Sequence, residues 1–86
     1  MARYRVEISR SVEKALLKLP QEILTKILEM IQGLPFRPRP VGCRKLSGER
    51  DVYRIRYSSY RIIYEIYEQI IVVRILKIGH RKDVYR

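Results

Sequence analysis

The sequence predicts an α+β fold in which two helices cover one face of a largely antiparallel sheet. Three observations predict it: polar–apolar alternation near the N-terminus, apolar residues at helical spacing after it, and three runs rich in Ile, Val and Tyr in the second half. The resulting order, strand, helix, helix, strand, strand, strand, is typical of α+β proteins. With 86 residues, the chain is expected to form one domain spanning residues 1–86.

The first strand and first helix follow from residues 4–19. Residues 4–8 alternate between apolar and polar, as in a strand with one buried face. Ser9 is a suitable N-cap, because its hydroxyl can accept a hydrogen bond from a free amide of the first helical turn. Val12, Leu16 and Leu19 then recur at helical spacing.

A second helix is predicted immediately after Pro20, which interrupts the first helix and is well placed to open the next. Its apolar stripe includes Ile23, Ile27 and Ile31, and Gly33 is expected to end it in a left-handed conformation. The short connection predicts that the two helices form an antiparallel hairpin.

Three strands are predicted in the second half, at Val52–Tyr57, Tyr60–Tyr67 and Ile70–Ile78. Before them, residues 34–40 contain three prolines and are expected to form an extended connection, and Ser47 and Gly48 indicate a turn. The natural reversals between the strands are the pairs at 58–59 and 68–69.

These reversals predict the register and therefore the two faces of the sheet. Two-residue turns would place Arg56 opposite Arg61, Glu65 opposite Val72, and Ile63 opposite Arg74. Because side chains alternate along a strand, one face would pack against the helices. Its members would be Tyr53, Ile55, Tyr57, Tyr60, Ile62, Tyr64 and Ile66, while Arg54, Arg56, Arg61 and Arg74 would gather on the other face.

The charge indicates an acidic partner. Lys and Arg number 19 against 9 Asp and Glu, a formal net charge of +10, and 13 of the 19 are Arg. Arginine binds phosphate through a planar fork and keeps its charge, so this composition favours a polyanion over an ordinary solvated surface. Residues 34–86 carry +8 of the net charge, which assigns the excess to the predicted sheet, its flanking loop and its tail.

The predicted pairing of Arg56 with Arg61 is the most specific local indication of a binding site. Like charges directly across two strands destabilise a sheet, so this pair predicts an anion site. The alternative is a water-facing arginine surface partly compensated by Glu65.

Other classes are excluded by composition. One cysteine, Cys43, and one histidine, His80, cannot build a four-ligand structural zinc site or a disulfide framework. The longest aliphatic run, residues 70–73, is too short to span a membrane, and the N-terminus is not typical of a signal peptide. We therefore expect a protein of the reducing cytoplasm, with no metal, no cofactor and no membrane partner.

The sequence resembles the RelE/ParE toxin superfamily, and more closely its RelE branch. The resemblance covers nearly the whole chain and is carried most specifically by residues 53–56, 60–65 and 78–85, which read YRIR, YRIIYE and IGHRKDVY. Residues 45–48, KLSG, and the helix break at Leu19 and Pro20 also fit the family.

This resemblance implies a toxin of a type II toxin–antitoxin system that inhibits translation. RelE-like members are ribosome-dependent endoribonucleases that cut messenger RNA in the decoding site. They use no metal: the 2′-hydroxyl attacks the adjacent phosphate. The implied partners are the ribosome, mRNA and a cognate antitoxin, with operator DNA bound only through the antitoxin complex.

Carried over by motif, the implied catalytic residues are Arg54, Arg56, Arg61, Arg81 and Tyr85. Arg54 and Arg56 stand where several members have Lys, and a guanidinium is a poor proton acceptor. The base therefore has two candidates, Tyr85 and His80, of which His80 has the better-suited ordinary pKa. Further RNA contacts are expected from Arg44, Lys45, Arg74, Lys77 and Lys82.

Three alternatives stay open at this point. The first is a ParE-like inhibitor of DNA gyrase on the same fold, against which the set of Arg61, Arg81 and Tyr85 argues. The second is a nucleic-acid-binding module without catalysis, which would bind with steep salt dependence and leave its ligand intact. The third is a degenerate toxin.

Overall fold

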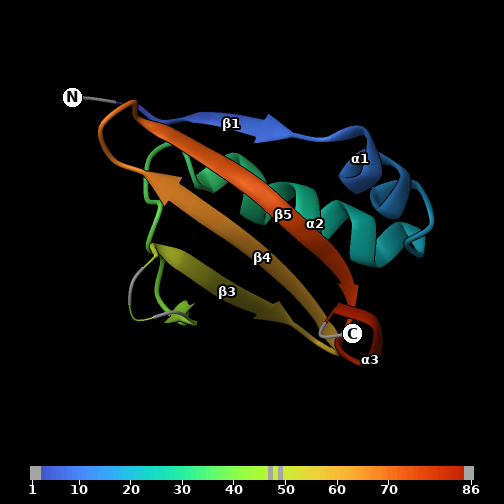
Figure 1. The fold of residues 1–86 in the computed structure, drawn as a ribbon. Coiled ribbons are helices and arrows are strands. Elements are labelled where there is room, and N and C mark those ends of the chain that lie inside the picture. Colours follow the sequence, from blue (N-terminus) through green and yellow to red (C-terminus); the bar gives the residue numbers. More distant parts are fainter. Residues whose placement is uncertain (1–2, 47, 49, 85–86) are drawn as a thin grey trace.

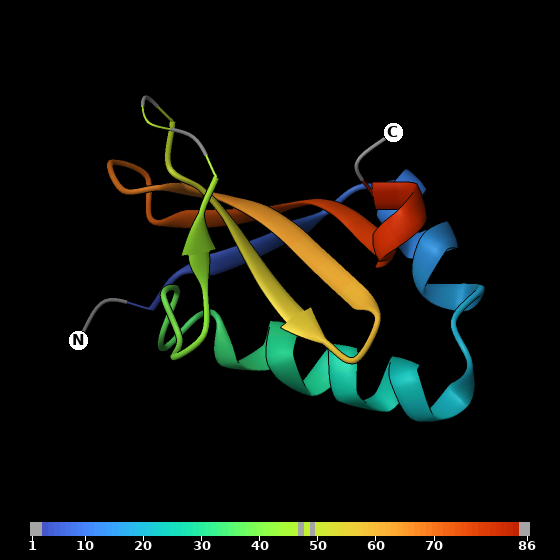
Figure 2. The ribbon, with the colours of Figure 1, turned by 90° about the horizontal axis from the view of Figure 1, so that it is seen from below.

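The computed structural model describes residues 3–46, 48 and 50–84 and confirms the predicted α+β fold. A sheet of five strands in the order β1-β5-β4-β3-β2 carries both long helices on one face (Figures 1 and 2). All neighbouring strands are antiparallel except β1 (Arg5–Ile8), which runs parallel to β5 (Val72–His80).

The two helices form where the sequence predicts them. Ser9 caps α1 (Arg10–Leu17): its Oγ accepts a hydrogen bond from the Val12 amide at 3.2 Å. The chain then reverses at Pro20, which is the N-cap of α2 (Gln21–Gly33), and α2 runs back across the sheet (Figure 2).

The end of α2 differs from the prediction. Gly33 does not have a positive φ; the Phe36 and Arg37 amides donate to the Gly33 carbonyl at 3.2 and 3.0 Å. These bonds and the fully buried Leu34 fold the connection into turns, so the expected extended segment was also wrong. Part of the predicted loop forms the short edge strand β2 (Arg44–Lys45).

The turn between β3 (Val52–Tyr57) and β4 (Tyr60–Tyr67) confirms the predicted register. Tyr57 pairs with Tyr60 and Arg56 with Arg61. The predicted inner face is also confirmed, because every one of its seven residues belongs to the core or packs against it. Tyr64 and Ile62 have no exposed surface, and Val12, Ile27 and Ile31 cover them from the helices.

The register predicted between β4 and β5 was wrong. The reversal has four residues, Glu68 to Ile71, and a bulge lies between Ile63 and Tyr64. Consequently Glu65 pairs with Arg74 rather than Val72, and Ile63 pairs with Lys77. The strand begins at Val72 instead of Ile70 because Ile70 and Ile71 form the turn and are exposed.

Ile71 holds this wider turn in an unusual conformation. Its φ is +55°, in the left-handed region, which costs an L-residue roughly 1–2 kcal/mol and is rare for a β-branched one. The turn is closed by the Ile71 amide, which donates to the Glu68 carbonyl at 3.3 Å, and the Ile71 carbonyl accepts from Arg5 of β1 at 3.0 Å.

We therefore predict that Ile71→Gly is more stable than Ile71→Ala by about 1 kcal/mol, because glycine adopts positive φ without penalty. Both changes remove the same side-chain contacts beyond Cβ, so they form a matched pair. Urea denaturation of the two variants measures the difference. Equal stability, or a more stable alanine variant, would show that this backbone conformation carries no strain.

Candidate nucleic-acid interface

Basic side chains gather on the face of the sheet that the helices leave uncovered, toward the end where β3 turns into β4. We call this surface the basic face. Two cross-strand rows build it: Arg44, Arg54, Ile63 and Lys77 lie in register in one row, and Arg56, Arg61 and Gly79 in the next. Its basic members are Arg44, Arg54, Arg56, Arg61 and Lys77.

Arg61 is the buried centre of the basic face. Only 9% of it is exposed, and its Nη1 donates to the carbonyl oxygens of Tyr60 and Ser58 at 3.1 and 3.4 Å. Its Nε is buried and has no hydrogen-bond partner in the described part of the chain. A buried cationic donor without a partner costs free energy, which an anion seated above the strand would recover.

The strand neighbours of Arg61 are a second cation and a glycine. Arg56 lies across from it on β3 and adds a second positive charge. Gly79 lies across on β5 and has no side chain. This arrangement suits a phosphate, whose oxygens accept several charged hydrogen bonds at once.

The C-terminal segment comes to the same end of the sheet. The Arg81 amide donates to the Ser59 carbonyl at 2.8 Å, which ties α3 (Arg81–Val84) to the β3–β4 turn (Figure 1). Arg81 and Lys82 are exposed beside the basic face. Tyr85, the other predicted catalytic residue of this tail, lies outside the described residues.

His80 points to the other side of the sheet. It pairs in register with Tyr60, a residue of the inner face, and its ring meets the Tyr60 ring edge-on at 5.6 Å. Its Nδ1 accepts a hydrogen bond from the Lys82 amide at 3.2 Å and so caps α3. The structure therefore does not bring His80 and Arg61 together.

Arg74 does not belong to the basic face, contrary to the predicted patch. The shifted β4–β5 register places it across from Glu65, beyond the small apolar cluster of Val52, Ile63 and Leu76. Its guanidinium donates twice to Glu7 of β1, at 3.0 and 3.1 Å, and lies 5.2 Å from the Tyr67 ring centre.

Lys45 also lies outside the basic face, on the other side of the sheet. It pairs in register with Tyr53 of the inner face, and its Nζ lies 3.4 Å from Asp51 Oδ1. Arg44, its neighbour in the chain, is in register with Arg54 and joins the basic face. The short strand β2 thus sends its two basic residues to opposite sides.

The acidic side chains of the sheet are concentrated at the opposite end. Arg50 forms a two-pronged ion pair with Glu65, and Tyr67 donates to the same carboxylate at 2.9 Å. The Arg50 contact, followed by the Tyr67 hydrogen bond, lowers the pKa of Glu65. Hydrogen bonding from Arg74, and to a smaller extent from Arg5, likewise lowers the pKa of Glu7.

Sequence reasoning did not single out Arg39, which holds the proline-rich connection to the sheet. Its Nε donates to the Tyr53 hydroxyl at 2.8 Å and its Nη2 to Glu68 at 2.7 Å, where the Tyr4 hydroxyl also donates. Nearby, the Tyr64 hydroxyl donates to the Pro38 carbonyl at 2.7 Å. No sequence pattern predicts these long-range contacts.

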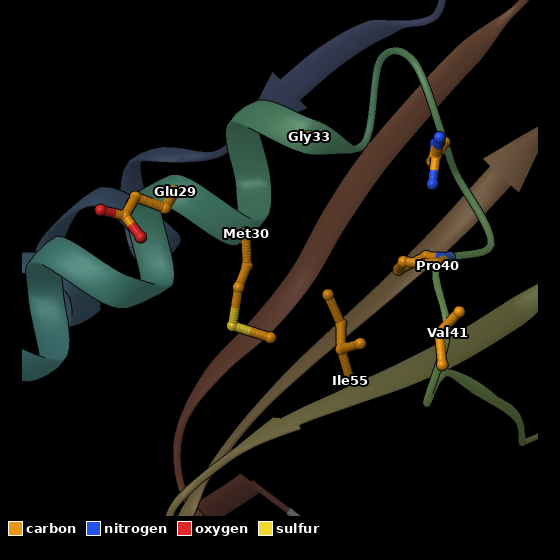
Figure 3. A pocket seen from close by; sticks show the side chains of 7 residues that line it. Glu29, Met30, Gly33, Pro40, Val41 and Ile55 are labelled. Atoms are coloured by element: carbon orange, nitrogen blue, oxygen red, sulfur yellow. The ribbon is translucent and has the colours of Figure 1, made fainter.

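A pocket of about 290 Å³ opens on the helix side, between α2 and β3. Met30 and Ile55 face one another across it, and Pro40 and Val41 form its far wall (Figure 3). Glu29 and Arg37 supply its charged groups. This lining suits an apolar side chain of a protein partner better than a phosphate.

Among the described residues, no three His, Cys, Asp or Glu side chains cluster as metal ligands would, and no helix is long and apolar enough to cross a membrane.

Fold and site together define a small α+β protein with a cationic sheet face. A family model described as ParE toxin of type II toxin-antitoxin system, parDE, matches residues 6–85. The chain belongs to this toxin family, as its resemblance to the RelE/ParE superfamily predicted.

Relatives over the full length carry RelE-type names. The putative toxin RelE1 of Methanocaldococcus jannaschii is 34% identical over 89 residues, covering 98% of this chain and 97% of that protein. Toxin RelG of Mycobacterium tuberculosis is 34% identical over 87 residues, covering 96% and 97%.

Solved structures agree with these relatives. The RelE-RelB complex of Pyrococcus horikoshii gives a TM-score of 0.83 at 36% identity, covering 95% of this chain and 99% of that one. The RelBE2 complex of M. tuberculosis gives 0.77 at 30%, covering 92% and 99%. The protein is therefore a RelE-like toxin of a toxin–antitoxin system.

The ion pairs at the other end of the outer sheet face predict that the folded protein loses stability at acid pH. Because the folded-state pKa of Glu65 lies below its ordinary value near 4.3, its ionised form stabilises the fold above that value. This contribution is lost as the pH falls through the lower, folded-state pKa. We expect the unfolding free energy of Glu65→Gln to fall less steeply than that of the wild type between about pH 5 and about pH 3.

Urea denaturation at a series of pH values measures this slope. Glu22→Gln is the matched control, since Glu22 is an exposed carboxylate of α2 that forms no ion pair within the described chain. Identical slopes for Glu65→Gln and the wild type would contradict the assignment.

Proposed function

We propose that this toxin is an mRNA interferase, a metal-independent endoribonuclease that cleaves messenger RNA in the decoding site of the ribosome and so stops translation in the cytoplasm. The observation that carries the proposal is the buried Arg61 with its unpartnered Nε at the centre of the basic face. A relative in Escherichia coli, 30% identical over 69 residues, is named mRNA interferase toxin RelE, which supports the same activity.

Cleavage by a 2′-hydroxyl requires three things: removal of its proton, neutralisation of the pentacovalent phosphate, and protonation of the 5′-oxygen. Arg61 supplies the second, since it is held in place by backbone carbonyls and needs little reorganisation. Arg54 and Arg56 extend the positive field along β3. Arg81, at the start of α3, would stabilise the leaving oxygen.

The base is the open role, with Tyr85 and His80 as its candidates. The geometry of His80 disfavours it, because its ring lies against Tyr60 on the inner face and its Nδ1 already accepts the Lys82 amide. Tyr85 follows α3, which is anchored beside the basic face. We therefore assign Tyr85 as the base; cations around the site would favour its ionised form.

Dependence on the ribosome fits a site that is open and has few groups for proton transfer. The ribosome would hold the codon against the basic face, and orientation of this kind is worth several kcal/mol. Lys77, Arg44 and Lys82 would bind the messenger backbone on either side of Arg61.

A cognate antitoxin is the proposed inhibitor. The RelE-type chains of P. horikoshii and M. tuberculosis were solved in complexes with RelB-type partners, which supports a partner of this kind here. An acidic segment would neutralise the basic face, and an apolar side chain would fill the pocket between Met30 and Ile55. Binding at both places would cover the site and anchor the partner on the opposite layer.

Gyrase inhibition is the second candidate, because the matching family model carries the ParE name. The two activities separate in vitro: messenger cleavage on programmed ribosomes supports the proposal, whereas inhibition of supercoiling without cleavage supports the alternative.

We predict that Arg61→Ala reduces messenger cleavage on programmed ribosomes by about 10²-fold or more, since it removes the principal phosphate-stabilising group. Arg74→Ala is the matched control, because Arg74 lies at the other end of the same face and pairs with Glu7. Circular dichroism checks that both variants are folded. Wild-type cleavage by a folded Arg61→Ala protein would refute the assignment.

We also predict that Tyr85→Phe slows cleavage more than His80→Gln does. Phenylalanine keeps the ring and removes only the titratable hydroxyl, and glutamine keeps an acceptor for the Lys82 amide. Single-turnover cleavage on ribosomes, measured as a function of pH, compares them. The reverse order would assign the base to His80.

A further inference from the structure

We propose that the outer face of α1 is a second RNA-binding surface, which holds the backbone of a structured RNA such as ribosomal RNA while the basic face holds the messenger. This inference rests on the proposed function for the identity of its partner. Its observations come from α1 itself, which contributes nothing to the basic face.

Three cations follow at four-residue spacing: Arg10 and Lys14 in α1, and Lys18 at its C-cap. At 100° per residue they occupy one stripe, directed away from the buried Val12 and Leu16. All three are exposed, and they span about 12 Å along the axis, enough to follow several phosphates.

Repulsion within the stripe is a cost in the isolated protein. Like charges four residues apart repel, and the helix dipole disfavours Arg10 at the first residue of α1, whereas it favours Lys14 and Lys18 at the C-terminal end. None of the three forms an ion pair with a carboxylate in the part of the chain that the structure describes. An external polyanion would compensate these costs, whereas ordinary solvation would not require the spacing.

The position of α1 allows both surfaces to act on one RNA assembly. α1 packs on the inner face of the sheet through Val12 and Leu16, and it lies at the same end of the molecule as α3 and the β3–β4 turn (Figures 1 and 2). Arg81 and Lys82 of α3 are exposed at that end as well. Two cationic surfaces on different sides of one end suit a groove walled by RNA on both sides.

The test removes the stripe and leaves the basic face intact. The variant combines Arg10→Gln, Lys14→Gln and Lys18→Gln; the control combines Arg3→Gln, Arg5→Gln and Lys26→Gln, which lowers the net charge equally at exposed positions outside both surfaces. Binding is measured at several salt concentrations to vacant ribosomes by sedimentation and to an RNA hairpin by fluorescence anisotropy. Circular dichroism and urea denaturation check the fold of both proteins.

We expect the stripe variant to bind ribosomes about tenfold more weakly than the control near 0.1 M salt, with the slope of log K against log salt reduced by about two. At saturating toxin its cleavage rate should equal that of the wild type, since the cleavage site is intact. Ribosome and hairpin affinities that match the control would overturn the proposal. Weakened binding to an acidic antitoxin alone would also overturn it and would make the stripe a protein-binding surface.

The experiments can refute the proposed function and the stripe proposal independently. If the wild-type protein leaves messenger RNA uncut on ribosomes, the proposed function is wrong, and the hairpin measurement still decides whether the stripe binds RNA. If the wild type cuts and the stripe variant binds and cuts like the control, only the stripe proposal is wrong.

Discussion

Alternation along β4 is the constraint on which both the core and the site depend. Six of its eight residues are buried, so this central strand has little freedom to shift. Ile62, Tyr64 and Ile66 pack beneath α1 and α2, and this packing fixes which side chains face the other way. A one-residue slip would exchange the two faces, burying Arg61 among aliphatic side chains and exposing Tyr64.

The same strand separates the charges of the outer face into two zones. Near its end, Glu65 is paired with Arg50 and lies across from Arg74, which Glu7 binds in turn. Near its start, Arg61 lies between Arg56 and a glycine, and its nearest acceptors are backbone carbonyls. The ion-paired zone stabilises the sheet internally, whereas the basic zone concentrates positive charge around Arg61.

The sequence predicted those parts of the fold that depend on interactions between residues close together in the chain. The Ser9 cap, the reversal at Pro20 and the Arg56–Arg61 pairing all depend on neighbouring residues and were confirmed. The β4–β5 register failed because it depends on a bulge after Ile63 and on the left-handed Ile71, a residue type that rarely adopts that conformation. Arg74 lies on the predicted face, but the shifted register separates it from Arg61, and no local pattern indicated that its partner Glu7 comes from a strand that pairs in parallel.

The parallel pairing of β1 with β5 also joins the two strands that lie farthest apart in the sequence. Glu7 and Arg74 are 67 residues apart, so the edge strand β1 has no partner until β5 is available. Contacts between such distant segments form late and slowly, because a long loop must close first. We therefore expect β1 to join the sheet last, after β3, β4 and β5 have paired with their neighbours in the chain.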